Sequence, residues 1–230
     1  MEAYVAPKSM ESREGLREYA HLILLAKDDV GYHNLMKLSS LAFIKGYYYK
    51  PRIDYNLLEE YSEGLICLSA CLAGDIPSLL LKGKYDEADA LASRLKDIFR
   101  DDFYIELQNH GLDDQLTVLP RLADLAKRLG IKTVATNDVH YVNKEDAEAQ
   151  DVLLCIQTGR YVDEENRMRM SADEFYLKSE DEMKKVLFEY RESLETTNEI
   201  AEKCNVEIVF GERRLPNFEV PEDYTSDGYL

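Results

Sequence analysis

The chain has 230 residues, 45% of them hydrophobic, which is enough for one large α/β domain or two small ones. Its net charge of −17 weighs against a broad surface that follows DNA phosphates, because proteins of that class are basic over at least one face. Without a signal peptide, a disulfide framework or the ~20 apolar residues that cross a bilayer, we expect a cytoplasmic protein with no membrane contact.

Short apolar runs alternate with segments of helical periodicity along the first two thirds of the chain. Strands are predicted at 64–69, 103–107 and 131–136, and helices at 84–100 and at 122–129, the latter ending at Gly130. A further apolar run, 21–25, begins with His21. This alternation predicts βα units and a mainly parallel sheet, in which active sites gather at the C-terminal ends of the strands.

Beyond about residue 160 the chain becomes charged and loop-like, and a connector is expected to begin after residue 145. Asn143 is a candidate N-cap for a helix through Ile156, whose apolar positions Val152, Leu153 and Ile156 are expected to be buried. Short strands are predicted at 174–178 and 205–210, with two helical stretches between them that end near Lys203. We therefore divide the chain into residues 1–145 and a small, mostly helical connector, residues 146–230.

Three potential metal ligands follow predicted strands. Asp138 and His140 come after the strand 131–136, and Cys71 follows the strand 64–69. With the early carboxylate of Glu2, such side chains suit zinc, manganese or iron. His21 fits less well, because it opens its apolar run instead of closing it. The alternative is structural: a turn aspartate beside a hydrogen-bonded histidine, and a small core cysteine.

Three further residues are candidates for substrate contact. Lys50 and Arg52 follow a run of tyrosines, a mixture that can stack a base and pair with a phosphate. A helix end followed by a proline turn explains the same residues. His110 follows the strand 103–107 and can line the same cleft, although a histidine beside a turn glycine is also a common structural feature. The sequence has no P-loop, dinucleotide-binding or nucleophile-elbow motif.

Seven segments, in order, resemble the alpha subunits of bacterial DNA polymerase III, the C-family replicative polymerases. They are EAYVAPK (2–8), HLILLAK (21–27), YKPRID (49–54), GLICLSACLAG (64–74), IELQNHG (105–111), ATNDVHY (135–141) and DVLLCIQTG (151–159). The resemblance covers most of the chain and places it in the later part of the N-terminal polymerase-and-histidinol-phosphatase (PHP) domain and the connector toward the palm.

The resemblance implies a distorted βα barrel whose rim holds up to three metal ions, zinc, manganese or iron. It implies phosphoesterase or 3′–5′ exonuclease activity there, and DNA synthesis with Mg²⁺ in the palm. By residue matching, Glu2 is the bridging carboxylate, His21 and Cys71 are the next ligands, and Asp138 and His140 are the final pair. The implied partners are DNA, deoxynucleoside triphosphates, the sliding clamp and a proofreading subunit.

The family's H-x-H and T-D-H-G motifs are expected upstream of Glu2, and its palm aspartates beyond Leu230. We therefore expect a partial barrel that lacks its first βα units, a depleted metal site, and no robust activity in the isolated chain. An exposed sheet edge and apolar surface also predict self-association. The alternative is a non-catalytic scaffold that stabilises the polymerase and binds the proofreading subunit. A stand-alone phosphatase is less consistent with the connector.

Overall fold

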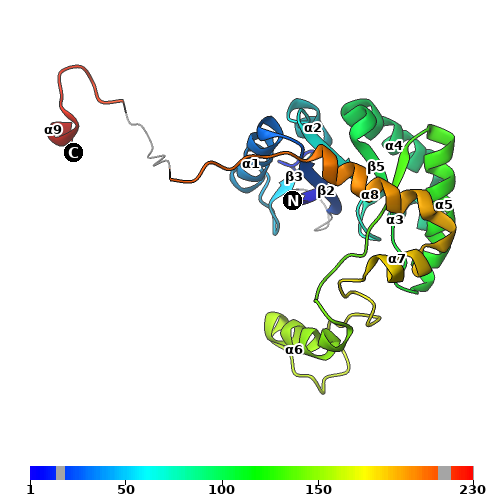
Figure 1. Ribbon diagram of the computed structural model, residues 1–230. Coiled ribbons are helices and arrows are strands. Elements are labelled where there is room, and N and C mark those ends of the chain that lie inside the picture. The colour runs from blue at the N-terminus through cyan, green and yellow to red at the C-terminus, as the bar shows by residue number, and fades with distance from the viewer. Residues whose placement is uncertain (14–18, 212–218, 230) are drawn as a thin grey trace.

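The computed structural model describes residues 1–13, 19–211 and 219–229. Its centre is a six-stranded sheet with the order β3-β1-β2-β4-β5-β6 (Figure 1). The strands are β1 (Glu2–Val5), β2 (Ala20–Ala26), β3 (Arg52–Ile53), β4 (Leu65–Leu68), β5 (Phe103–Leu107) and β6 (Lys132–Ala135). The predicted strands at 64–69, 103–107 and 131–136 are thereby confirmed.

The sheet is mixed, because β2 runs antiparallel to both of its neighbours, β1 and β4. The pairs β1–β3, β4–β5 and β5–β6 are parallel. The prediction of a mainly parallel sheet therefore holds for five strands and is wrong for β2, whose direction apolar periodicity cannot reveal. Within the described residues the sheet ends at β3 and β6, so closure into a barrel is not seen.

Five helices follow the strands and pack against one face of the sheet. They are α1 (Asp29–Ile44), α2 (Tyr55–Glu60), α3 (Asp75–Leu81), α4 (Tyr85–Phe99) and α5 (Asp113–Leu129). The main hydrophobic core lies between these helices and inward-facing strand residues such as Leu24 and Ile105. Local sequence sets the helix ends: Asp28 caps α1, and Gly130 ends α5 with a φ of 61°.

The opposite face of the sheet is covered by α8 (Arg191–Lys203), which is preceded by α7 (Glu180–Val186) and a short 3₁₀ turn, η3 (Phe188–Tyr190). Ile200 of α8 packs on Ile66, Tyr104 and Val134, and the Thr197 hydroxyl donates to the Ala135 carbonyl. The helices expected before Lys203 are therefore present and pack on the sheet. The boundary at residue 145 stays a prediction.

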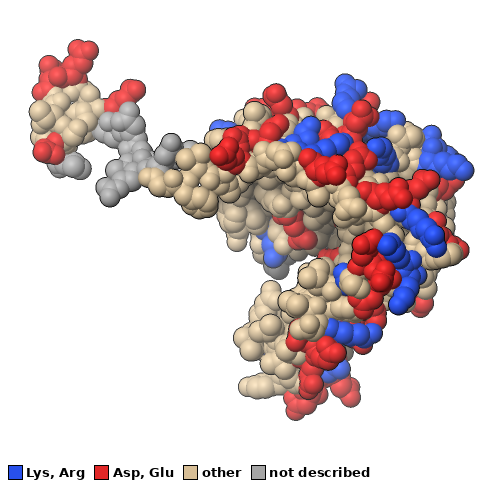
Figure 2. All heavy atoms as spheres, viewed as in Figure 1, with Lys and Arg blue, Asp and Glu red and all other residues tan. Residues whose placement is uncertain are grey.

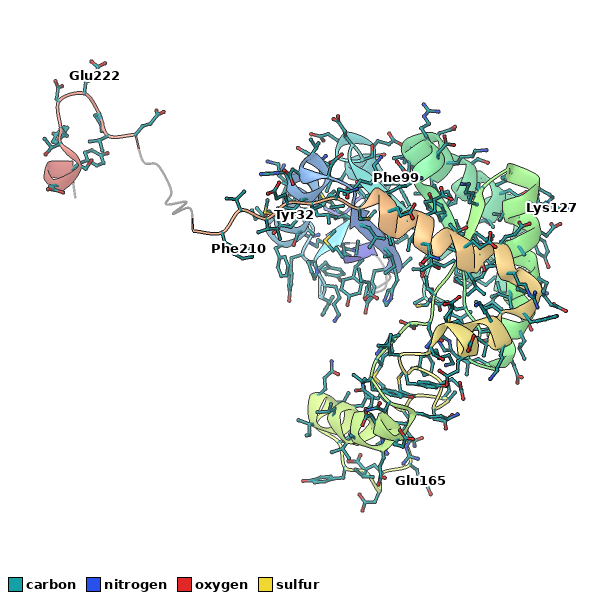
Figure 3. All side chains as sticks on the ribbon, viewed as in Figure 1. Tyr32, Phe99, Lys127, Glu165, Phe210 and Glu222 are labelled. Carbon is teal, nitrogen blue, oxygen red and sulfur yellow. The ribbon has the colours of Figure 1, made fainter. Side chains whose placement is uncertain are left out.

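The helix α6 (Ala147–Thr158) projects from the sheet together with the loops on either side of it (Figure 1). Asn143 caps a 3₁₀ turn, η2 (Lys144–Asp146), directly before it. The expected burial of Val152, Leu153 and Ile156 is wrong: these side chains are exposed, Ile156 by 72%. Much of the visible surface of this unit is uncharged (Figure 2), and Glu165 lies in its distal loop (Figure 3).

The two short strands predicted in the connector do not form. Residues 174–178 make a single bridge, from Tyr176 to Tyr141, and residues 205–209 are irregular and mostly exposed. The apolar side chains at 208–210 are exposed, that of Phe210 by 88%. A short helix, α9 (Ser226–Tyr229), lies near the C-terminus. No helix in the described part of the chain is long and apolar enough to span a membrane.

Candidate metal centre

The reversal of β2 explains how His21 reaches the edge where the parallel strands end. Because β2 is antiparallel to β4, its first residues lie beside the residues that follow Leu68. The His21 N–H donates to the Ala73 carbonyl at 2.9 Å, and His21 forms a bridge with Gly74. His21 therefore fits the candidate site even though it opens its apolar run, because the start of an antiparallel strand and the ends of its neighbours share one edge.

Glu2 and His21 form the first of two carboxylate–imidazole pairs. Their strands are paired so that Glu2 faces Ile23 and Tyr4 faces His21, which places all four side chains on one face of the sheet. Nδ1 of His21 lies 3.4 Å from Oε2 of Glu2. This nitrogen is buried and makes no hydrogen bond to the described residues. The His21 ring also contacts those of Tyr4 and Tyr19, which restrict its orientation.

Asp138 and His140 form the second pair, in the loop after β6. Nε2 of His140 lies 3.4 Å from Oδ1 of Asp138, and both side chains are partly exposed. Asp138 has a φ of 44°, in the left-handed region that few side chains tolerate. The backbone N–H of His140 donates to the Phe175 carbonyl, and the Phe175 ring meets the His140 ring edge to face. The segment beyond residue 170 therefore helps to hold this loop.

Carboxylates from both pairs affect the pKa of Cys71. Burial, together with the smaller effects of the negative charges of Asp138, Glu106 and Glu2, raises the pKa of its thiol to about 11. Glu2, at the start of β1, and Asp138, after β6, thus both lie close enough to Cys71 for their charges to act on it. A bound cation would reverse this effect, because a coordinating thiol loses its proton.

The chemistry of these five side chains suits a divalent metal. Carboxylate, imidazole and thiolate are the usual ligands of zinc, manganese and iron, and the buried, unpartnered Nδ1 of His21 is available as a donor. In the described ranges, however, no three His, Cys, Asp or Glu side chains converge closely enough to hold one ion. Among the described residues the structure therefore shows two carboxylate–imidazole pairs and a thiol, and no single cluster of ligands.

His110 lies behind the metal candidates and not in an open cleft. It is 2% exposed and stacks on Phe175 with ring centroids 4.3 Å apart. Its Nε2–H donates to the Asn137 carbonyl at 2.7 Å, and its Nδ1 accepts from Gln115 at 2.7 Å. With both ring nitrogens occupied, His110 cannot bind substrate in this conformation. It instead fixes the residue that precedes Asp138.

The two basic candidates separate in the structure. Arg52 is 4% exposed, and its guanidinium donates to the carbonyls of Met10, Ser12 and Gly46, so it holds loops together and does not face a substrate. Lys50 is exposed, and its Nζ lies 5.3 Å from the centroid of the Tyr4 ring. Because Tyr4 contacts His21, Lys50 remains a candidate cation beside the site.

The sequence analysis missed Glu106. This carboxylate is 4% exposed near the end of β5, and burial raises its pKa to about 7. The available signal was an acidic residue inside the apolar run Phe103-Tyr104-Ile105-Glu106-Leu107, where solvent exposure was not expected.

Comparison with known proteins gives a consistent result. Residues 1–110 match the PHP domain family. The chain is 48% identical to DNA polymerase III subunit alpha of Treponema pallidum over 98% of its length, and 45% identical to those of Borreliella burgdorferi and Thermus aquaticus over 99% and 100%. It spans 20% of the length of each of these relatives. By sequence, the chain is therefore a PHP-containing segment of the DNA polymerase III alpha subunit family.

Proposed function

We propose that the chain acts within a DNA polymerase III alpha subunit and supplies the metal-holding residues of a phosphoesterase site with 3′–5′ exonuclease activity. The proposal is supported most directly by the Glu2–His21 and Asp138–His140 contacts, each 3.4 Å long, and by the hydrogen bond from the His21 N–H to the Ala73 carbonyl in the loop that carries Cys71. In the whole subunit, DNA synthesis with Mg²⁺ belongs to a separate palm. DNA, deoxynucleoside triphosphates, the sliding clamp and a proofreading subunit are its proposed partners, in the cytoplasm.

In this mechanism the five side chains would hold the metal ion and balance its positive charge. Zinc, manganese or iron bound there would supply hydroxide near neutral pH and stabilise charge on the phosphoryl oxygens. Glu2 and Asp138 balance the positive charge, while His21 offers a nitrogen that has no other hydrogen-bond partner in the described structure. Tyr4 and Tyr19 keep the His21 ring in place, which lowers the cost of ordering it on binding.

The substrate proposed for this site is the 3′ end of a single DNA strand. A pocket of about 550 Å³ beside His21 is lined in part by Tyr19, Ser78 and Lys82, and this volume is within the range that accommodates small ligands. Lys82 in this pocket and Lys50 beside Tyr4 provide positive charge near an otherwise acidic site. Local cations of this kind suit a single phosphate and do not require a broad basic surface.

A non-catalytic scaffold is the second candidate. It is favoured by the absence, among the described residues, of any three ligands close enough to share one ion, and by the exposed apolar face of α6. In this role the PHP unit would stabilise the polymerase and offer a surface to a proofreading subunit. The two proposals differ in one measurable property, the dependence of nucleotide release on the ligand side chains.

The test uses a full-length alpha subunit that contains these 230 residues, with Asp138→Asn and His140→Ala combined. We expect metal-dependent release of nucleotides from a labelled single-stranded 3′ end to fall to background, while DNA synthesis by the same sample is retained. His33→Asn, on the exposed side of α1, is the matched control. Unchanged nucleotide release would remove the exonuclease proposal and leave the scaffold. For the isolated chain we expect neither polymerase nor robust nuclease activity.

A further inference from the structure

Glu106 connects the two loops that carry proposed metal ligands. Its Oε2 accepts a hydrogen bond from the backbone N–H of Ala70 at 2.5 Å, directly before Cys71. Its Oε1 accepts from the Thr136 hydroxyl at 2.7 Å, two positions before Asp138. The loop after β4 and the loop after β6 are thereby joined through one side chain of the strand between them.

Both loops contain backbone that needs such support. Ala70 has a φ of 64° and Asp138 a φ of 44°, a left-handed region that is strained for most residues other than glycine. The hydrogen bond from Ala70 to Glu106 holds the first strained residue directly. In the second loop, the support comes through Thr136, whose Oγ1 also accepts from Gln108 at 2.9 Å.

The Glu106 backbone also belongs to this connection. Its N–H donates to the Ser69 hydroxyl at 2.9 Å, so the backbone and side chain of Glu106 bind consecutive residues of the first loop. A leucine in this position would fill the space but would leave the buried N–H of Ala70 without its acceptor, which destabilises the fold. The geometry therefore explains why a carboxylate is buried here despite the cost of desolvating it.

We infer that Glu106 is a positioning residue that sets the Cys71 loop and the Asp138–His140 loop relative to each other. It contacts neither metal nor substrate and acts through Ala70 and Thr136. The assignment of those loops as ligand-bearing rests on the proposed function. The link between them rests on the hydrogen bonds alone, so the two claims can fail separately.

The first measurement is amide hydrogen exchange of the metal-free chain. Glu106→Asp, one methylene shorter, and Glu106→Ala cannot reach both partners, so exchange should accelerate in 69–74 and in 136–140 together. Glu106→Gln keeps one acceptor oxygen for Ala70 and should retain most of the protection in 69–74. Leu95→Ala, which removes a core side chain of α4, controls for general destabilisation, and exchange in the two loops should accelerate no more than in the rest of the sheet. Unchanged exchange in either loop of Glu106→Ala would overturn the inference.

The second measurement is titration of the same variants with Co²⁺, whose thiolate charge-transfer band reports binding to Cys71. Glu106→Asp should weaken Co²⁺ binding roughly 10–100-fold, as for other residues that orient metal ligands, with Leu95→Ala unaffected. Unchanged Co²⁺ affinity in a protein whose two loops have loosened would overturn the positioning role. A Co²⁺ response that is insensitive to Cys71→Ser and Asp138→Asn would instead contradict the proposed ligand set, leaving the loop connection to be judged by hydrogen exchange.

Discussion

Nδ1 of His21 lies 3.4 Å from Oε2 of Glu2, and the antiparallel pairing of β1 with β2 brings these two side chains onto one face of the sheet. The contact is made without any hydrogen bond to the imidazole nitrogen in the described structure. A buried nitrogen in this state loses the hydration it would have in the unfolded chain. Binding of a cation at this position would recover part of that loss.

The first prediction concerns this pair. Glu2→Gln and His21→Asn should each lower the Zn²⁺ affinity of the chain by at least about 10-fold, because each removes a charge or a donor from the proposed ligand set. Competition with a chromophoric chelator measures the affinity. His33→Asn makes the same chemical change on exposed α1 and should have no effect. Equal affinities for His21→Asn and His33→Asn would show that His21 is not a ligand.

The second prediction separates stability from metal binding at Asp138. Asparagine tolerates the left-handed region, so Asp138→Asn should leave the free energy of unfolding within about 0.5 kcal/mol of the original value. Asp138→Ala should cost about 1 kcal/mol more, since alanine lacks that tolerance. Both variants should nevertheless bind Zn²⁺ more weakly. Urea unfolding and metal titration provide the two measurements, and retained affinity in Asp138→Asn would contradict the role of its charge.

The third prediction uses the buried imidazole of His110. Burial lowers the pKa of His110 from its ordinary 6.5. The unfolded chain therefore takes up this proton at higher pH than the folded protein does. The stability that His110 contributes is fully present above about pH 6.5 and is lost as pH falls through the lower folded value.

Replacement by the non-titrating His110→Gln should remove this part of the pH dependence. Urea midpoints measured between pH 7.5 and 5 should fall more steeply for the original chain than for His110→Gln. His33→Gln, altered on the exposed surface of α1, should retain the original slope. Parallel curves for the original chain and His110→Gln would mean that His110 is not kept neutral by its surroundings.

The limits of prediction from sequence are clear in β2 and at Glu106. Apolar runs located β4, β5 and β6 because a buried strand needs a continuous hydrophobic segment. The same signal carries no direction, so the reversal of β2, and with it the place of His21, came only from the structure. Glu106 was missed because its role depends on Ala70 and Thr136, which are distant in sequence and become partners only when three strands align.

Helical periodicity has a related limit in α6. It marks the apolar residues Val152, Leu153 and Ile156 but does not say whether anything covers them. In the structure their side chains are exposed, while Leu154 and Cys155 face inward. The exposed surface formed by Val152, Leu153 and Ile156 is therefore the candidate contact for the expected self-association.

The last prediction compares two adjacent leucines of α6. Leu153 is 58% exposed and Leu154 is 8% exposed. Leu153→Glu should leave the free energy of unfolding within about 0.5 kcal/mol of its original value, as expected at the surface. Leu154→Glu should lower it by at least about 2 kcal/mol, from lost packing alone. Thermal or urea unfolding measures this difference.

The same pair tests self-association through α6. If chains associate through this surface, Leu153→Glu should shift the mass measured by light scattering toward that of one chain and reduce the binding of an apolar dye. Lys144→Glu, just before α6 and outside its apolar surface, changes charge without removing apolar area and should leave the mass unchanged. An original chain that already has the mass of one copy and binds no dye would show that the exposed face of α6 does not drive association. A mass that stays high in Leu153→Glu would place the contact elsewhere, with the open edges at β3 and β6 as the next surfaces to alter.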